Sequence, residues 1–300
     1  MQYTAIISIT GKGLRWQRSR LEKREYMMKN IHYVLANPSG NTTVFVLNPV
    51  ADGERAGLAA RLLRSDCIKA EQVGFLTMNG TANGAGLRID MMGGEFCGNA
   101  SRSAAAYAAM VEGLETSEYI ISCSGCMTNL KANVRKRASG VYDASIEMPL
   151  PQSVDAVIID IGGAPCRFFR VVLPGIVHFV FMGKGAAAVN RNIFWQAVKT
   201  YTSGENYAAY GLILLDPTIW KMIPAVYVKQ TNTLYWEHSC GSGSAAAAAA
   251  IAYMGNRNIA VKLQQPGGVI AAAAVVAKGE LQYITIGGEV TLETEKIIEI

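Results

Sequence analysis

The sequence has few charged residues and no long apolar run. Only 17% of its 300 residues are charged and 50% are hydrophobic, which excludes a disordered chain and favours a large buried core. No apolar stretch approaches the roughly 20 residues that a membrane-spanning helix needs, because Ser244 and Gly255 flank even the alanine run. We therefore expect no membrane partner. The length of 300 residues predicts two domains of about 130–150 residues each.

The net charge of +5 is concentrated at one end of the chain. Residues 1–28 hold six basic and two acidic side chains, so this segment carries +4 and residues 29–300 are close to neutral. A nucleic-acid surface on the folded body is therefore disfavoured. A secretory signal would place its charges before a longer apolar core, and here the apolar residues come first. We expect residues 1–28 to be a disordered basic extension, with an amphipathic targeting segment as the alternative.

The chain also lacks the cysteine spacing of a zinc site. Cys123-Ser124-Gly125-Cys126 is a CxxC, but no second CxxC exists to complete a metal site. A redox pair would need a helix after it, and residues 127–134 favour a strand. These two residues are interpreted as structural thiols, and no metal is expected. Six cysteines without an export signal predict free thiols in the cytoplasm rather than a disulfide framework.

What the chain does contain is a repeated cysteine–glycine turn before an alanine-rich stretch. Cys97-Gly98-Asn99 leads into residues 100–110, and Cys240-Gly241-Ser242 leads into residues 244–254. Alanine is the best helix former, so both segments predict a helix that begins directly after a cysteine. The partial positive charge of a helix N-terminus stabilises a thiolate.

The remaining segments are mostly β-rich and divide into two similar halves. We predict an α+β fold of two pseudo-symmetric halves, each an antiparallel β-rich sheet or barrel around a central Ala-rich helix. The boundary is placed at the prolines near residue 150. The N-terminal half spans residues 29–149, completed by a C-terminal strand at 287–300, and the C-terminal half spans 150–286.

Two thiols facing each other across a cleft could invert an amino acid at its α-carbon. At a helix start, the pKa of Cys97 or Cys240 could fall from ~8.5 to roughly 3.5–7.5, which suits a base. One thiolate would remove the α-proton and the opposite thiol would return one. The free N–H groups of the two helices would bind the substrate carboxylate, and no cofactor is required.

The two cysteine motifs resemble those of racemases with the diaminopimelate epimerase fold. Glu95 to Ala100 and Ser239 to Gly243 carry the resemblance, and Gln265-Pro266-Gly267-Gly268 matches a further motif. The resemblance covers about residues 29–300 and implies that Cys97 and Cys240 are the two acid–base residues. It also implies that the substrate is bound by Asn41, Gln72, Gly98, Asn99, Gly241 and Ser242, the last four through backbone N–H groups.

The departures from this pattern bear on the substrate. Diaminopimelate epimerases carry an arginine for a distal carboxylate before the second cysteine, whereas this chain reads Trp236-Glu237-His238-Ser239-Cys240. The sequences of these motifs are similar to those of histidine racemases of opine-type metallophore synthesis. We therefore expect a single amino acid, histidine being the candidate, with diaminopimelate as the alternative. Glu71 is a candidate to pair with a polar or cationic side chain of the substrate, or is a solvated glutamate at the end of a strand.

Other interpretations remain open from the sequence. Glu95 and Glu237 precede the two thiols and either orient the substrate ammonium and tune the cysteines, or are surface carboxylates. Cys240 with His238 could form a cysteine-hydrolase dyad, although residues two apart on a strand lie ~6–7 Å apart. A non-catalytic amino-acid-binding protein is a third alternative. The expected partner is a small-molecule amino acid, with no nucleic acid and no membrane, and a homodimer is allowed for.

Overall fold

The computed structural model describes residues 30–66, 68–78 and 86–300, so the basic extension predicted at 1–28 lies outside the described residues. The helices are α1 (Asp52–Arg64), α2 (Gly98–Glu112), α3 (Arg191–Tyr201) and α4 (Gly241–Gly255), with a short 3-10 helix η1 (Ala186–Ala188). The first strands are β1 (Asn30–Asn37), β2 (Thr43–Val46), β3 (Gln72–Met78), β4 (Leu87–Met91), β5 (Thr116–Cys123), β6 (Leu130–Ala138) and β7 (Val141–Glu147). The following strands are β8 (Ser153–Ile161), β9 (Ala164–Leu173), β10 (Ile176–Met182), β11 (Ala209–Asp216), β12 (Lys221–Val228) and β13 (Thr233–Trp236). The last strands are β14 (Ile259–Gln265), β15 (Gly268–Ala277), β16 (Glu280–Leu292) and β17 (Lys296–Glu299).

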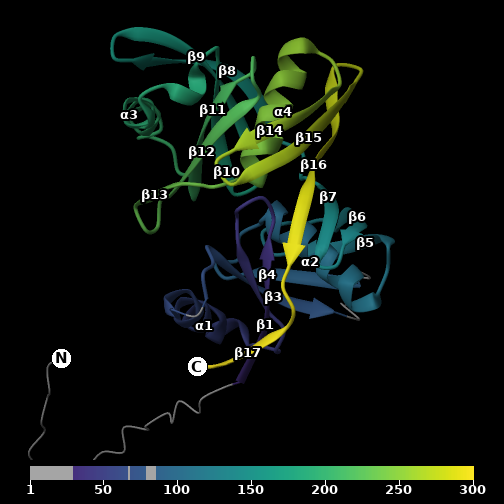
Figure 1. Cartoon of the computed structure of the whole chain (residues 1–300). Helices are drawn as coiled ribbons and strands as arrows, with labels where there is room; N and C mark the ends of the chain where they lie inside the picture. The colour runs from purple at the N-terminus through teal and green to yellow at the C-terminus, as the bar shows by residue number, and fades with distance from the viewer. Residues whose placement is uncertain (1–29, 67, 79–85) are drawn as a thin grey trace, which may run out of the picture.

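The chain forms a mixed α+β fold with two lobes (Figure 1). Strands β1 to β7 with α1 and α2 make the lower lobe of the view, and β8 to β15 with α3 and α4 make the upper lobe. The strand β16 passes from the upper lobe into the lower one, and β17 ends beside β1. Among the described residues, no helix is both long and apolar enough to cross a membrane.

The sheets are not antiparallel throughout, which corrects the prediction from the sequence. Most neighbouring strands pair antiparallel, but β2–β3, β4–β5, β10–β11 and β12–β14 pair in parallel. A parallel pair needs a crossover of a dozen or more residues, whereas an antiparallel pair can be joined by a short turn. The helices supply these crossovers: α1, α2 and α3 each join two consecutive parallel strands, and α4 leads into β14.

The helices α2 and α4 are buried along most of their length, up to Ala109 and Ala252. Residues 245–250 of α4 are entirely shielded from solvent, and this helix contacts β9, β10, β11, β14, β15 and β16. Alanine side chains add little bulk, so strands can approach the helix closely on several sides. Both helices end in the left-handed conformation that closes a helix, at Gly113 (φ 69°) and Asn256 (φ 43°).

The long strand β16 connects the two lobes. Its first part pairs with β15 of the upper lobe, and residues 285–291 pair with β7 of the lower lobe. Its end continues beside β1, where Leu292 lies opposite Ala36. The side chain of Ile286, in the middle of this strand, is fully buried. The residues that follow the upper lobe in sequence therefore complete the sheet of the lower lobe.

Candidate active site

The two cysteines predicted to be catalytic occupy the same structural position in their halves. Cys97 is the N-cap of α2 with φ −130° and ψ 106°, and Cys240 is the N-cap of α4 with φ −126° and ψ 113°. The Sγ atom of Cys97 accepts a hydrogen bond from the backbone N–H of Ala100 at 3.4 Å. The Sγ atom of Cys240 accepts one from Gly243 at 3.2 Å. Each thiol thus takes the place of the Ser, Thr, Asp or Asn oxygen that usually caps a helix.

The N-termini of the two helices meet at Ile286 of β16. A Cβ atom on Gly98 would lie 2.9 Å from Cδ1 of Ile286, and one on Gly241 would lie 2.8 Å from the same atom. The same Cβ atom on Gly241 would lie 3.4 Å from the backbone nitrogen of Asn99. Both glycines therefore lie against the same side chain, which brings the free N–H groups of two helices to one place.

Hydrogen bonds between side chains link the two halves beside the thiols. The Nδ2 atom of Asn99 donates to Oγ of Ser239 and to Oδ1 of Asn41, each at 3.3 Å. Ser239 in turn donates to the backbone oxygen of Pro38 at 3.3 Å. All three side chains are buried. The turn that carries Cys240 is thus held against the loop before β2 and against the start of α2.

Gln72 connects the predicted substrate-binding residues to Cys97. Its Nε2 atom donates to Oδ1 of Asn41 at 2.9 Å and to Oγ1 of Thr43 at 2.8 Å, and lies 3.4 Å from Sγ of Cys97. The same Asn41 donates from Nδ2 to Oε2 of Glu71 at 2.9 Å. Asn41, Glu71, Gln72 and Cys97 therefore form one network of contacts.

Cys240 has a different set of side-chain neighbours. Oγ of Ser242 lies 3.5 Å from its Sγ and 3.0 Å from Nε2 of His178. His178 is fully buried on β10, and this burial lowers its pKa to about 3, so the ring is neutral. The backbone N–H of Cys240 donates to Oε1 of Gln265 at 2.8 Å, and Gln265 donates from Nε2 to Oγ of Ser244 at 2.9 Å. The second thiol is thereby fixed by β10 and by the end of β14.

Burial raises the pKa of both thiols, which corrects the prediction of depressed values. The pKa of Cys97 rises to about 11, and the hydrogen bonds from Ala100 and Gln72 offset only part of the desolvation. The pKa of Cys240 is well above its usual range because of burial and the nearby carboxylate of Glu237. The helix N-termini are present as predicted, but removing a charged sulfur from water costs more than they return.

The two glutamates that precede the thiols have different environments. Glu95 is exposed to solvent, as the interpretation as a surface carboxylate anticipated. Glu237 is partly buried, and its pKa rises to about 7 through desolvation and through the charge of Glu71. Its Oε2 atom is shielded from solvent and has no hydrogen-bond partner among the described residues. Glu237 is therefore the glutamate that can respond to a charge entering the site.

The imidazole of His238 faces Glu71 and not the adjacent thiol. Nδ1 of His238 pairs with Oε1 of Glu71, across the boundary between the halves. Within the described part of the chain, no hydrogen bond joins His238 to Cys240. This geometry gives no support to the hydrolase dyad that the sequence left open.

Sequence reasoning missed several residues that build the site. Arg102 is fully buried and donates from Nη1 to the backbone oxygen of Gly288 at 2.9 Å and from Nε to Oδ1 of Asn99 at 3.2 Å. Burial lowers its pKa to about 10. The signal in the sequence is a single arginine inside an alanine-rich helix, three residues after Asn99, where its side chain shares a helix face with that asparagine. Thr43 and Ser239 were missed because short hydroxyl side chains carry no spacing signal.

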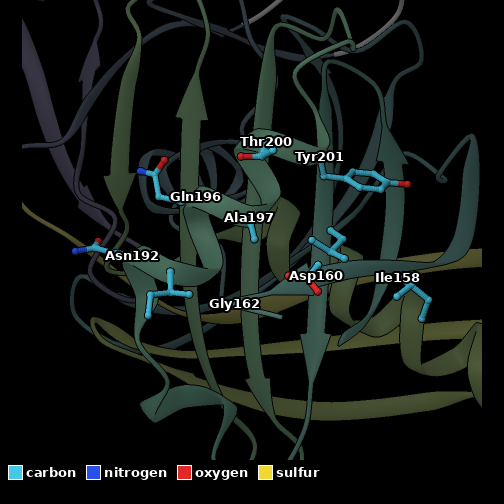
Figure 2. Close-up of a pocket in the computed structure, with 10 residues that line it drawn as sticks. Ile158, Asp160, Gly162, Asn192, Gln196, Ala197, Thr200 and Tyr201 are labelled. Carbon is cyan, nitrogen blue, oxygen red and sulfur yellow. The ribbon is translucent and has the colours of Figure 1, made fainter. Parts of the chain in front are cut away.

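A surface cavity lies away from this network. Figure 2 shows it between β8 and α3, with residues such as Ile158, Asp160, Gln196 and Tyr201 around it. Its volume is about 630 Å³. None of the predicted site residues lines this cavity. Across the described residues, no group of three or more His, Cys, Asp or Glu side chains is placed to hold a metal ion.

Comparison with known proteins identifies the family. The family model described as "Histidine racemase CntK N-terminal domain" matches residues 30–297. The chain belongs to this family. It is 34% identical over 220 residues to a histidine racemase of Fusobacterium nucleatum, covering 72% of this chain and 79% of that protein. It is 28% identical over 265 residues to a histidine racemase of Staphylococcus aureus, covering 87% of this chain and 94% of that protein.

Solved structures with the same fold are more distant in sequence. A Bacillus anthracis phenazine biosynthesis protein of the PhzF family matches 91% of this chain and all of its own, with a TM-score of 0.64 and 16% identity. A hydroxyproline epimerase from Agrobacterium vitis matches 90% of this chain and 91% of its own, with a TM-score of 0.62 and 12% identity. These likenesses show the fold, while the family assignment and the curated relatives identify the chain as an isomerase, an amino-acid racemase or epimerase.

Proposed function

We propose that this racemase inverts the α-carbon of histidine by a two-cysteine acid–base reaction that needs no cofactor. The observation that carries the proposal is that Cys97 and Cys240 cap two buried helices whose N-termini meet. In one direction, the first cysteine acts as a thiolate and takes the α-proton from one face of the substrate. The thiol of the second cysteine gives its proton to the opposite face. One S–H bond forms and the other breaks, so the two cysteines exchange roles with each turnover.

The substrate carboxylate is proposed to bind at the helix N-termini. The first N–H groups of a helix have no partner within the helix and carry partial positive charge. Those after Cys97 and Cys240 belong to Gly98, Asn99, Gly241 and Ser242. Negative charge grows on the carboxylate as the α-proton leaves, so donors fixed in advance stabilise the transition state more than the ground state.

The substrate ammonium is proposed to assist the formation of the thiolate. Burial and Glu237 hold the pKa of Cys240 well above its usual range, and burial raises the pKa of Cys97 to about 11. A positive charge within a few ångströms favours the charged form of both groups. The amino acid brings that charge, so the base becomes active when the substrate is bound. The carboxylate of Glu237, on the residue three before Cys240, is the proposed partner of the ammonium.

Histidine is the proposed substrate because the relatives from Fusobacterium nucleatum and Staphylococcus aureus are histidine racemases, and because the sequences of the cysteine motifs resemble those of such enzymes. Diaminopimelate is the rival. It is disfavoured by the lack of an arginine in residues 236–239, where the epimerases of that substrate carry one for the distal carboxylate.

An isotope experiment tests the mechanism. In deuterated water, the wild-type enzyme should place deuterium at the α-carbon of L- and D-histidine while inverting them, and should leave diaminopimelate unchanged. Cys97→Ala and Cys240→Ala should each lower the rate of inversion by at least about 10³-fold, since each removes an acid–base group. Cys166→Ala, on β9, is the matched control and should retain the wild-type rate. Normal inversion by either active-site variant would rule out the two-thiol reaction.

We further propose a domain division that follows the repeated plan of the chain. Residues 29–149 with 287–300 form one half and residues 150–286 form the other, each built around its Ala-rich helix. The matching caps of α2 and α4 and the pairing of β16 with β7 support this division. The five described cysteines are free thiols, which supports a place of action in the reducing cytoplasm.

A further inference from the structure

The pair formed by Glu71 and His238 joins the two halves at the edge of the active site. Glu71 lies just before β3, and His238 lies between β13 and the cap of α4. Nδ1 of His238 pairs with Oε1 of Glu71, while the other carboxylate oxygen accepts a hydrogen bond from Asn41 at 2.9 Å. The carboxylate is therefore held from its own half by an amide and from the opposite half by an imidazole.

This pair lies close to both thiols: to Cys97 through the contact that Gln72 makes, and to Cys240 along the chain. Gln72, the neighbour of Glu71, reaches Sγ of Cys97 and Oδ1 of Asn41. His238 is two residues before Cys240. A group bound to Oε1 of Glu71 is thus close to the network that surrounds the reacting sulfurs, which suits the side chain of a substrate whose α-carbon lies between them.

The two partners differ in how firmly they are fixed. The backbone of His238 is anchored, because its oxygen accepts from the N–H of Gly267 at 2.8 Å and a Cβ on Gly267 would lie 2.8 Å from Cβ of His238. The imidazole itself is 64% exposed, whereas the Glu71 side chain is 34% exposed. The ring can therefore rotate into solvent while the carboxylate stays in place.

The group paired with the Glu71 carboxylate is an imidazole, which is also the side-chain group of the proposed substrate. We propose that His238 occupies the carboxylate of Glu71 as an internal surrogate for the imidazole of the substrate, and that the substrate displaces it on binding. The inference rests on the proposed function, because it identifies what the same site recognises in its substrate. An aliphatic amino acid could not replace the hydrogen bond that His238 gives up, so it would be rejected.

The cost of displacement is small, so the surrogate tunes affinity without blocking the enzyme. Exposed pairs of this kind contribute a factor of up to about fivefold in an equilibrium constant. When a ligand must first displace an internal group, its apparent dissociation constant equals the intrinsic constant divided by the fraction of molecules in which the position is free. Removing the surrogate should therefore strengthen the binding of the substrate, whereas removing the carboxylate should weaken it.

Steady-state kinetics with histidine test these opposite signs. His238→Ala should lower KM by about two- to fivefold with kcat within about twofold. Glu71→Gln should raise KM by at least about tenfold, since the charged acceptor is replaced by a neutral amide that binds more weakly. In the double variant the benefit of His238→Ala should disappear. A higher KM in His238→Ala, or an unchanged KM in Glu71→Gln, would overturn the proposal.

The chain offers a matched control. His32 and Glu295 form a second His–Glu pair, with Nδ1 of His32 2.6 Å from Oε1 of Glu295, and they connect β1 to the segment before β17. Their side chains are 42% and 50% exposed, so this pair too lies at the surface, and neither residue belongs to the site network. His32→Ala and Glu295→Gln should leave KM for histidine unchanged, which separates the effect of losing a surface pair from the effect of losing this one.

NMR spectroscopy of the imidazole signals tests the displacement without turnover. The chain has three histidines, and His178 is fully buried, so His238→Ala assigns the remaining signals directly. Titration of the wild-type protein with imidazole should move the His238 signal towards that of a free imidazole and leave the His32 signal in place. An unmoved His238 signal at saturation would contradict the surrogate. If imidazole displaces His238 but histidine is not racemised, the proposed function fails and the binding site stands.

Discussion

Asn99, the second residue of α2, donates a hydrogen bond at 3.3 Å to Ser239, the residue before Cys240. This bond joins the turn of the first thiol directly to the turn of the second. The same amide donates to Asn41, and its oxygen accepts from the buried guanidinium of Arg102. Asn99 therefore holds the two cysteine turns against each other and against the loop before β2.

Replacing Asn99 by alanine should damage activity and stability together. The change leaves the buried Ser239 hydroxyl with one partner fewer and removes an acceptor from Arg102. We expect the free energy of unfolding to fall by about 2 kcal/mol and kcat/KM to fall by about 10²-fold, because small displacements of reacting groups have large effects on rate. Urea unfolding and racemisation assays measure the two effects. Asn192→Ala at the surface cavity should change neither, and an active Asn99→Ala enzyme would contradict the role of this bond.

Glu237→Gln should stabilise the protein at high pH. The pKa of Glu237 is raised from 4.5 to about 7 in the folded protein, so the folded state holds its proton more tightly than the unfolded state. Ionising it costs stability, and this cost is absent below pH 4.5, grows between pH 4.5 and 7, and is complete above pH 7. Glutamine is never ionised, so the variant should be about 2 kcal/mol more stable than wild type at pH 8 and equal to it at pH 4.5.

Thermal unfolding across this pH range provides the measurement for Glu237. The exposed Glu280, at the start of β16, is the matched control, and Glu280→Gln should follow the wild-type curve. If the difference between Glu237→Gln and wild type were the same at every pH, its ionisation would not be the cause.

The reactivity of the cysteines towards iodoacetamide should follow both their exposure and the fraction of each that is a thiolate. With a pKa of about 11, only about one Cys97 side chain in a thousand is a thiolate at pH 8. Cys240 and Cys123 are buried, and burial raises the pKa of each. Cys97, Cys126 and Cys166 are all partly exposed, but the raised pKa of Cys97 keeps its thiol protonated. Peptide mass spectrometry should therefore find Cys126 and Cys166 alkylated before the other three, and preferential labelling of Cys97 would show that its thiolate is more stable than its burial allows.

The interior of α4 should reject a larger side chain. Ala247 is fully shielded from solvent on a helix that contacts strands on several sides. Ala247→Leu adds three carbon atoms to this space, and we expect it to lower the free energy of unfolding by about 3 kcal/mol or to prevent folding. Tyr253, on the same helix, is 52% exposed, and Tyr253→Ala should change stability by about 0.5 kcal/mol or less. Equal effects in urea unfolding would contradict the packing of α4.

The helix caps could be predicted from the sequence because their signals are local. A cysteine, a glycine and a run of alanines specify the start of a helix within a few residues, and α2 and α4 begin where this pattern places them. The family resemblance implied that Asn41, Gln72 and Asn99 line one site, and in the structure their side chains are joined by hydrogen bonds. Each of these residues lies in a motif that the sequence shows directly.

The parallel strand pairs and the thiol pKa values could not be predicted, because both depend on distant segments. Pairing of β2 with β3 or of β10 with β11 is set by where a crossover helix packs, not by the composition of the strand. The pKa of Cys97 depends on how completely other strands exclude water from it. Arg102 is stabilised by backbone oxygens of residues 144, 288 and 289, more than forty positions away along the chain.

The course of β16 has a consequence for synthesis on the ribosome. The lower lobe begins with β1, yet its β7 pairs with residues 285–291 and its β1 pairs with residues 296–299. A nascent chain that stops anywhere before these residues leaves two strand edges open, and open edges favour aggregation. The first lobe to emerge is thus the last to be completed. Removal of only the final twenty residues should expose strand edges of the lower lobe, the part of the chain that is synthesised first.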